Sequence, residues 1–453
     1  ISACLVGSEM CIRDRCDNSM RERDTSTVGE QGRAGNTEGT VFAPARKRWD
    51  WITPFASLRS RNFRLYIIGM LLATTALQMQ SLAQNYLIYQ LTDMATAIGY
   101  VSAAVGISLL FTSLAGGVAA DRLPKRTLMV IGQLGIGVFA LFIGVMVTAG
   151  LIQVWHIVVS SVAVGLIAGF TMPARQAYVP DLVGEENLVN ALALSSGMMN
   201  VTRIGGPALA GILIGMFGVA PLFYVKFVAY GIFVIFLLLI PVTGKAVMSA
   251  SASAFGDAID GFRYLRHDRK VLDLLILGVV PTILGMPYVN FLPVFQEEVF
   301  HVGPSELGLM MSAVGGGAVV GSLVVASLGD YQHKGHFLLA TGLGFSVTLI
   351  LFNVVASTGS FPVSLVMLAL VGMTGTGFMA LNNALVLAVT LPEMRGRIMG
   401  VFMTTFGLMP LGALPMGSLI DSVGAPLTVG GFALAMLGFF VIMALFRPSI
   451  RHL

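Results

Sequence analysis

The sequence predicts an all-α polytopic membrane protein with about twelve transmembrane helices. Only 11% of its 453 residues are Asp, Glu, Lys or Arg, whereas a soluble domain has about 25% charged residues. Because 56% of the residues are hydrophobic, most of the outer surface must face an apolar medium. Several apolar runs reach the roughly 20 residues that a helix needs to cross a bilayer. The sequence lacks the alternating segments of about ten residues that are typical of transmembrane β-barrels.

The N-terminal segment differs in character from the rest of the chain. ISACLVGSEMCIRDR at 1–15 has no helical period and resembles the translated read-through of a sequencing adapter, with a natural disordered tail as the alternative. We interpret 1–19 as such an artefact, Met20 as the true start and all of 1–58 as a disordered cytoplasmic tail without a signal peptide. All three cysteines lie in this tail, so we expect no disulfide framework in the membrane body.

Apolar runs between polar breaks define the individual spans. We expect one six-helix bundle at 59–242, a cytoplasmic linker at 243–270, a second six-helix bundle at 271–446 and a cytoplasmic tail at 447–453. The expected spans centre on 70–86, 101–119, 128–148, 154–170, 192–214, 223–240, 272–295, 307–328, 337–356, 361–381, 399–420 and 427–446.

Basic residues mark one side of the membrane. Lys and Arg occur before the first span and after every even-numbered span, whereas the loops on the other side hold acids but no Lys or Arg. The positive-inside rule places the basic side in the cytoplasm, and an even number of spans then places both termini there. The net charge of +4 therefore reflects topology and does not indicate nucleic-acid binding.

The two halves carry an internal repeat. Residues 99–121 align with 308–330 at an offset of 209 residues, and 211–218 register with 417–424. Two similar halves in parallel orientation are typical of secondary transporters, whose substrate site lies between the halves near mid-membrane.

The loop after the second span, GGVAADRLPKR at 116–126, concentrates charge in a chain that otherwise avoids it. Its pattern is carried by Gly117, Asp121, Arg122, Lys125 and Arg126. This pattern resembles the signature loop of the major facilitator superfamily, although a proline stands where the family has a glycine before the basic pair.

By this resemblance the loop is a cytoplasmic gate. Asp121 ends a helix, where an anion is disfavoured, and the family's architecture gives it a partner at the N-terminus of the eleventh span. The basic residues of the loop would then pair with nearby acids. The alternative is that they only set topology. The other residues assigned to the gate are Asp330 and Lys334, from a degraded second copy of the loop, and Arg395 and Arg397.

Other segments narrow the resemblance to one branch. RNFRLYIIG at Arg61, MPARQAYVPDLV at Met172 and PEMRGRIMGVFMTTFG at Pro392 are similar to the transmembrane secretion effectors, which include enterobactin and macrolide exporters. The resemblance covers 59–446 and implies export of a siderophore, macrolide or similar hydrophobic compound across a bacterial inner membrane. It also implies alternating access and proton antiport. Gly206, Pro207 and Gly211 resemble an antiporter motif, with ordinary small-residue packing as the alternative.

The resemblance implies a substrate cavity lined by the first, fourth, seventh and tenth spans. Arg203 lies near mid-membrane, where a charge is costly, and either contacts substrate or ties helices together. Lys226 lies nearer the outer end of its span, and we expect it to snorkel to the surface. The uncharged candidates, whose alternative role is hydrogen bonding between helices, are Gln78, Gln80, Gln84, Asn85, Tyr288, Asn290, Thr374, Asn382 and Asn383.

Several motifs are missing from the sequence. No Asp or Glu lies in the middle of a span. Two alternatives therefore stay open: an acid at the outer end of a span couples transport to protons, or the protein is a facilitator. Without paired catalytic acids, an HExxH motif, a phosphate loop or a Cys/His cluster, we expect neither an enzyme nor a cofactor or metal. The expected partners are a small-molecule substrate, the lipid bilayer and protons, with no nucleic acid, and the chain is expected to be a monomer. An uptake carrier and a lysophospholipid flippase stay open as alternatives, whereas a non-transporting role would leave the repeat and the gate unexplained.

Overall fold

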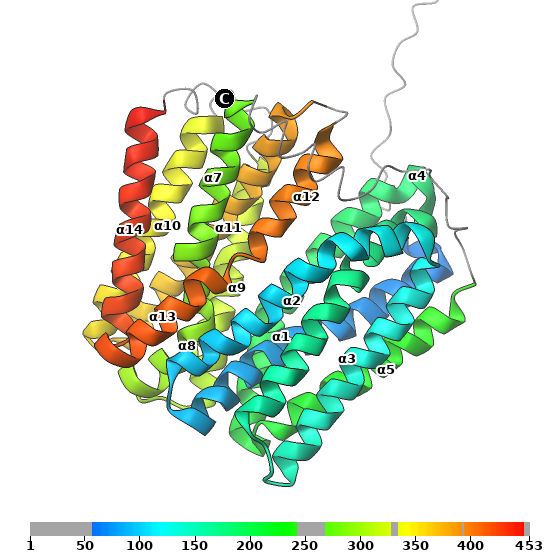
Figure 1. Ribbon diagram of the computed structural model, residues 1–453, viewed down its shortest axis with the longest axis horizontal. Helices are drawn as coiled ribbons and strands as arrows, with labels where there is room; N and C mark the ends of the chain where they lie inside the picture. Colours follow the sequence, from blue (N-terminus) through cyan, green and yellow to red (C-terminus); the bar gives the residue numbers. More distant parts are fainter. Residues whose placement is uncertain (1–56, 242–267, 328–333, 392–393, 448–453) are drawn as a thin grey trace, which may run out of the picture. The chain divides into compact units, whose positions relative to one another are not determined.

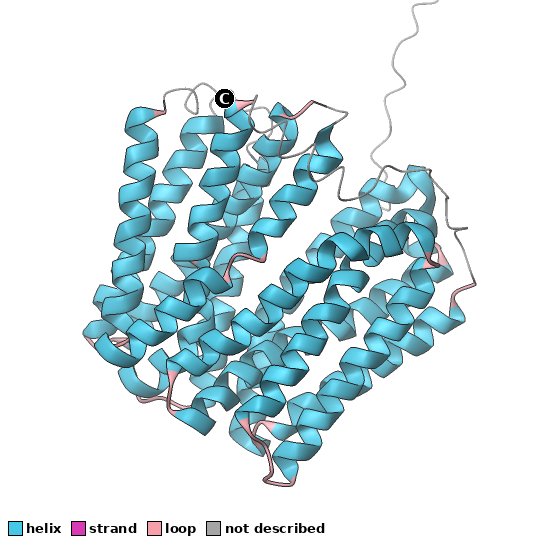
Figure 2. Ribbon diagram, in the orientation of Figure 1, coloured by secondary structure: helices cyan, strands magenta, loops and turns pink. Residues whose placement is uncertain are grey.

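The computed structural model describes residues 57–241, 268–327, 334–391 and 394–447. Within these ranges every regular element is a helix, as Figure 2 shows, and eleven helices are long and apolar enough to cross a membrane. The predicted fold class is therefore confirmed. The expected linker lies outside the described residues except for its last three residues.

The first half of the protein contains six spans in five continuous helices. Ser60 caps the first helix, because its side chain accepts a hydrogen bond from the N–H of Phe63 at 3.4 Å. The fourth helix holds two spans, Val154–Gly184 and Glu186–Phe217, which meet at Gly184, where φ is +71°. The helices are α1 (Arg61–Thr92), α2 (Ala95–Arg122), α3 (Lys125–Thr148), α4 (Val154–Phe217) and α5 (Ala220–Leu239).

The second half is more irregular, since prolines interrupt two of its spans. Pro287 and Pro293 lie in the seventh span, which changes from α-helix to 3-10 and then to π-helix. The eleventh span breaks at 407–409 before Pro410, which cannot donate a backbone hydrogen bond. The elements are α7 (Arg269–Leu284), η2 (Met286–Phe291), α8 (Leu292–Val294), η3 (Phe295–Val299), α9 (Pro304–Ser327), α10 (Lys334–Ser357), α11 (Phe361–Val389), α12 (Arg395–Phe406), α13 (Pro410–Val423) and α14 (Ala425–Phe446).

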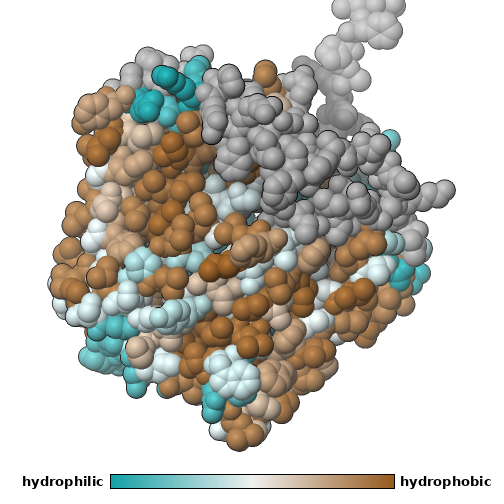
Figure 3. All heavy atoms as spheres, viewed as in Figure 1, coloured by the Kyte–Doolittle hydropathy of each residue, from teal (hydrophilic) through white to brown (hydrophobic). Residues whose placement is uncertain are grey.

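Each half is a bundle of packed helices. In the first half α3 packs against α5, and α4 packs against both α1 and α2; in the second half α11 packs against α9 and α10 (Figure 1). On the face drawn in Figure 3, hydrophobic side chains form large patches on the left side and in the lower part, as a lipid-facing surface requires. Ser57 was expected in the disordered tail, but it is buried and donates a hydrogen bond of 2.6 Å to Asn190.

The halves meet through α2 with α13 and through α4 with α9. A Cβ on Gly211 would lie 2.8 Å from the Cα of Gly308, and a Cβ on Gly417 would lie 2.8 Å from the carbonyl oxygen of Ala95. Gly211 and Gly417 are repeat-related, so the two interfaces use the same position of the repeat. We call this end of the bundle, which contains the α1–α2 turn at Asp93, the Asp93 end, and the opposite end the Arg61 end.

Candidate substrate cavity and gates

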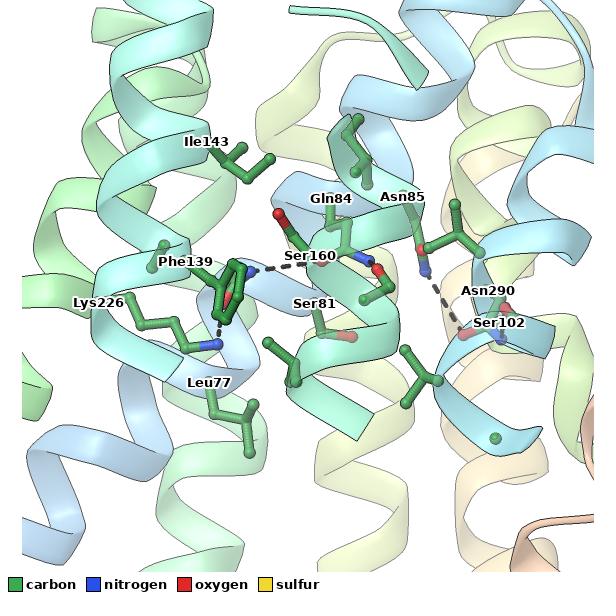
Figure 4. A pocket seen from close by; sticks show the side chains of 18 of the residues that line it. Leu77, Ser81, Gln84, Asn85, Ser102, Phe139, Ile143, Ser160, Lys226 and Asn290 are labelled. Atoms are coloured by element: carbon green, nitrogen blue, oxygen red, sulfur yellow. Dashed lines mark hydrogen bonds between the residues drawn. The ribbon is translucent and has the colours of Figure 1, made fainter. Parts of the chain in front are cut away.

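A cavity of about 320 Å³ lies among α1 to α5 and is completed by residues of the second half (Figure 4). Its apolar wall includes Leu77, Phe139 and Ile143, and its volume lies at the lower end of the range of about 300–1,000 Å³ that is usual for ligand pockets. Its polar lining residues are Gln80, Ser81, Gln84, Asn85, Ser102, Ser160, Ser161, Lys226 and Asn290.

The helix α1 presents its amides to this cavity. Gln80 and Gln84 are one turn apart and therefore share a face. The Nε2 group of Gln80 donates to Oε1 of Gln84 at 3.4 Å, and Nε2 of Gln84 donates to the hydroxyl of Ser161 at 3.2 Å. Both glutamines therefore line this cavity.

Lys226 also lines the cavity, so the expectation that it snorkels to the surface is wrong. Its side chain is only 2% exposed, its Nζ donates to Oε1 of Gln80, and it lies 5.2 Å from the centre of the Tyr230 ring. The sequence contained a signal for this position. Phe223 and Tyr230, one turn away on either side, belong to the same buried stripe of α5, whereas Val228 is exposed.

Two asparagines connect the halves at the cavity. Nδ2 of Asn85 donates to Oδ1 of Asn290 at 3.4 Å, and Nδ2 of Asn290 donates to the hydroxyl of Ser102 at 3.1 Å. Asn290 lies in η2, so the irregular backbone of the seventh span places this amide against α1 and α2. Figure 4 shows the three side chains pointing toward one another.

The other residues expected in the cavity do not line it. Gln78 packs against α4, where a Cβ on Gly206 would lie 2.7 Å from its Cβ. Arg203 is exposed on α4, and Thr374 hydrogen-bonds to Thr348 of α10 at 3.1 Å. The remaining three are Tyr288, which is buried in η2, and Asn382 and Asn383, which lie in α11.

The small residues of the expected antiporter motif lie in helix contacts. Gly206 faces α1, as described above, while Pro207 and Gly211 face α9 of the other half. A Cβ on Gly308 would lie 2.7 Å from the carbonyl oxygen of Pro207. Small residues let the two backbones approach closely here, which is the packing role of such motifs.

At the Arg61 end, the described basic residues of the expected gate bond within their own half. Lys125 forms an ion pair of 2.8 Å with Asp181, and Arg126 donates to the carbonyl oxygen of Leu238 at 2.7 Å. Arg395 donates to the carbonyl oxygen of Thr390 at 3.4 Å, and Lys334 begins α10. The structure does not describe the surroundings of Gly117 or the side chains of Asp121, Arg122, Asp330 and Arg397.

At the Asp93 end, polar contacts join the halves. The Asp421 carboxylate at the end of α13 accepts hydrogen bonds from the backbone N–H groups of Ala95 at 2.6 Å and Thr96 at 3.0 Å. The hydroxyl of Tyr89 in α1 donates to Glu298 in η3. Neither carboxylate was predicted from the sequence to form part of a gate.

Comparison with known proteins identifies relatives that are similar to this chain over most of its length. A family model described as transmembrane secretion effector matches residues 52–451. The multidrug efflux pump Tap of Mycolicibacterium fortuitum is 25% identical over 385 residues, which cover 81% of this chain and 91% of that protein. The enterobactin exporter EntS of Shigella dysenteriae serotype 1 (strain Sd197) is 24% identical over 414 residues, covering 89% and 96%.

A solved structure shares the fold. The crystal structure of the nucleoside transporter NupG superposes with a TM-score of 0.67, covering 86% of this chain and 99% of that chain at 17% identity. The relatives are transporters and not enzymes, as expected from the sequence. With a family match over nearly the whole chain, two packed helical bundles and glycine contacts between them, the protein belongs to the transmembrane secretion effector family of major facilitator transporters.

Proposed function

We propose that this protein exports small organic molecules across the bacterial inner membrane by alternating access, with both termini in the cytoplasm. The observation that carries the proposal is a partly polar cavity beside the boundary of two bundles that are joined at one end. The names of the relatives, which include a multidrug efflux pump and an enterobactin exporter, support export of drug-like compounds or siderophores.

The contacts between the halves suit one state of such a cycle. Asp421 with Ala95, Tyr89 with Glu298 and Gly211 with Gly308 hold the Asp93 end together. Since basic loops mark the Arg61 end as cytoplasmic, this arrangement corresponds to the state that faces the cytoplasm. In the opposite state, Asp121 would approach the N-terminus of α12, with Arg122, Lys125 and Arg126 as its neighbours in the gate.

Proton antiport is the proposed source of energy. Inverted membrane vesicles with an imposed proton gradient test it, because export from the cytoplasmic side becomes uptake into the vesicle. Macrolides and catechol siderophores are added one at a time while a pH-sensitive dye reports the gradient. We expect at least one compound to collapse the gradient.

Two matched variants complete this experiment. Asp121→Asn should abolish the response because it removes the gate charge, whereas Asp93→Asn should retain it. Asparagine tolerates the left-handed conformation of Asp93, whose φ is +51°. A response that survives in Asp121→Asn would contradict the gate. If correctly inserted wild-type protein leaves the gradient intact but accumulates labelled compound, proton antiport is wrong and export stands.

A further inference from the structure

We propose that the cavity selects organic anions and that the ammonium group of Lys226 recognises their negative charge. This inference rests on the proposed function, because it takes the cavity on α1 to α5 as the substrate cavity. It narrows the substrate class from small organic molecules to carboxylates and other acidic compounds of similar size.

The cavity wall contains a basic side chain but no acidic one among the described residues. Among the described residues that line it, Lys226 is the one acidic or basic side chain. Within the described part of the chain, Lys226 forms no ion pair, and its side chain is 2% exposed. A buried charge without a counter-ion is costly, so an anionic ligand would supply the missing partner.

The ammonium group also has unused hydrogen-bonding capacity. It has three N–H donors, and the hydrogen bond recorded for it in the described structure goes to Oε1 of Gln80. Gln80 in turn donates to Gln84, and Gln84 donates to Ser161. All three bonds are donated in the direction away from Lys226, so the lysine stands at the donor end of the chain.

Serine hydroxyls extend this excess of donors. Ser161 and Ser102 each accept a hydrogen bond from an amide, and neither donates one to a described residue. The Oγ of Ser160 is buried, lines the cavity and has no partner among the described residues. A carboxylate only accepts hydrogen bonds, so it can bind the hydroxyl and ammonium donors that have no acceptor in the described part of the protein.

The rest of the wall specifies an organic rather than an inorganic anion. Leu77, Val105, Leu109, Phe139 and Ile143 contribute apolar surface to the cavity of about 320 Å³. A small inorganic anion would leave this surface in contact with water or empty space. An aromatic or aliphatic acid fills the space and brings its carboxylate to Lys226, beside which Figure 4 shows the ring of Phe139.

The alternative role of Lys226 is structural, because its bond to Gln80 ties α5 to α1. A matched pair of probes separates the two roles. Binding of 1-naphthoate and of its neutral amide, 1-naphthamide, is measured by calorimetry on the purified full-length protein in lipid nanodiscs. We expect wild-type protein to bind the carboxylate about tenfold more tightly than the amide, as one charge-assisted hydrogen bond allows.

Variants of Lys226 then locate the selectivity. Lys226→Met should lose the preference for naphthoate while its affinity for the amide stays within about twofold of the wild-type value. Lys226→Arg should keep the preference. Gln80→Glu should also lose it, because a carboxylate next to Lys226 replaces the ligand's charge. Lys270→Met, which removes an exposed charge at the start of α7, serves as the control and should bind like wild type.

Three results would overturn the anion site. These are equal affinities of wild-type protein for the two probes, failure of wild-type protein to bind naphthoate, and an equal loss of both probes in folded Lys226→Met. The last result would assign Lys226 a structural role. Transport of neutral compounds in vesicles combined with any of these results would leave the export proposal standing. Selective naphthoate binding without transport of any compound would support the anion site but contradict the export proposal.

Discussion

The Asp421 carboxylate at the end of α13 accepts a hydrogen bond of 2.6 Å from the backbone N–H of Ala95, the first residue of α2. A second oxygen accepts from the N–H of Thr96 at 3.0 Å, so one acid of the second half caps a helix of the first half. The first turn of a helix has unpaired N–H groups and a partial positive charge, which favour this anion. This contact has the form expected for Asp121, but it lies at the opposite end of the bundle.

Asp421→Asn should weaken closure of the Asp93 end. The variant keeps a side-chain acceptor but loses the charge, which is worth about 1 kcal/mol at a helix N-terminus and changes a two-state population about fivefold. The measurement is the rate at which an impermeant maleimide, added on the side of the Asp93 end, labels Leu109→Cys in the cavity wall. The three native cysteines are first replaced by serine.

We expect faster labelling in Asp421→Asn and an unchanged rate in Ser422→Ala, an exposed neighbour whose hydroxyl bonds to the carbonyl oxygen of Leu419 in its own helix. An unchanged rate in Asp421→Asn would show that the cap does not contribute to closure.

Gly308→Val should prevent the approach of α9 to α4. A Cβ at this position would lie 2.7 Å from the carbonyl oxygen of Pro207, so the two halves would have to separate. Overpacking of this kind costs about 1–3 kcal/mol, so we expect transport in the vesicle assay to fall at least about fivefold. Gly316→Val on the same helix meets nothing within 4 Å and is the matched control. Equal transport by the two variants would refute the close-contact role of Gly308.

The sequence was sufficient for the fold because membrane insertion depends on local properties. The run at 337–356 lies within α10, Lys334–Ser357, since hydrophobic length alone decides whether a helix can cross a bilayer. The break of the eleventh span was harder to predict. A proline inside an apolar run is compatible with either a kink or a break, and neighbouring helices decide between them.

The candidate site was less predictable, because the direction in which a side chain points depends on how its helix is rotated in the bundle. Gln80 and Gln84 line the cavity, whereas Gln78, from the same helix, packs against Gly206. Lys226 was wrongly predicted to reach the surface because only its depth in the membrane was considered. Its position between the buried aromatic residues of α5 indicates that its side chain points into the bundle. Asp421 of the eleventh span caps α2 through a contact between residues about 325 positions apart in the sequence, and no local sequence pattern predicts such a contact.

The ion pair between Lys125 and Asp181 should contribute little to stability. Their side chains are 27% and 24% exposed, and pairs of this kind contribute about 0–1 kcal/mol. A double-mutant cycle with Lys125→Met and Asp181→Asn, followed by thermal unfolding in nanodiscs, should give a coupling energy in this range that decreases at high salt. A coupling energy well above about 1 kcal/mol, insensitive to salt, would contradict this prediction.

Asn382→Leu should stabilise the protein. Asn382 is fully buried in α11, and neither its Oδ1 nor its Nδ2 has a hydrogen-bond partner among the described residues. A buried polar group that lacks partners costs about 1–3 kcal/mol, and leucine of similar size removes this cost. The unfolding temperature in nanodiscs should therefore rise more than it does in Asn353→Leu, because Asn353 also has an Oδ1 that lacks a partner in the described structure, but its Nδ2 donates a hydrogen bond of 2.7 Å to the carbonyl oxygen of Leu349. A lower unfolding temperature in Asn382→Leu would contradict this prediction. It would mean that the amide forms stabilising hydrogen bonds that are absent from this state, which would support the role in the substrate cavity that the sequence suggested.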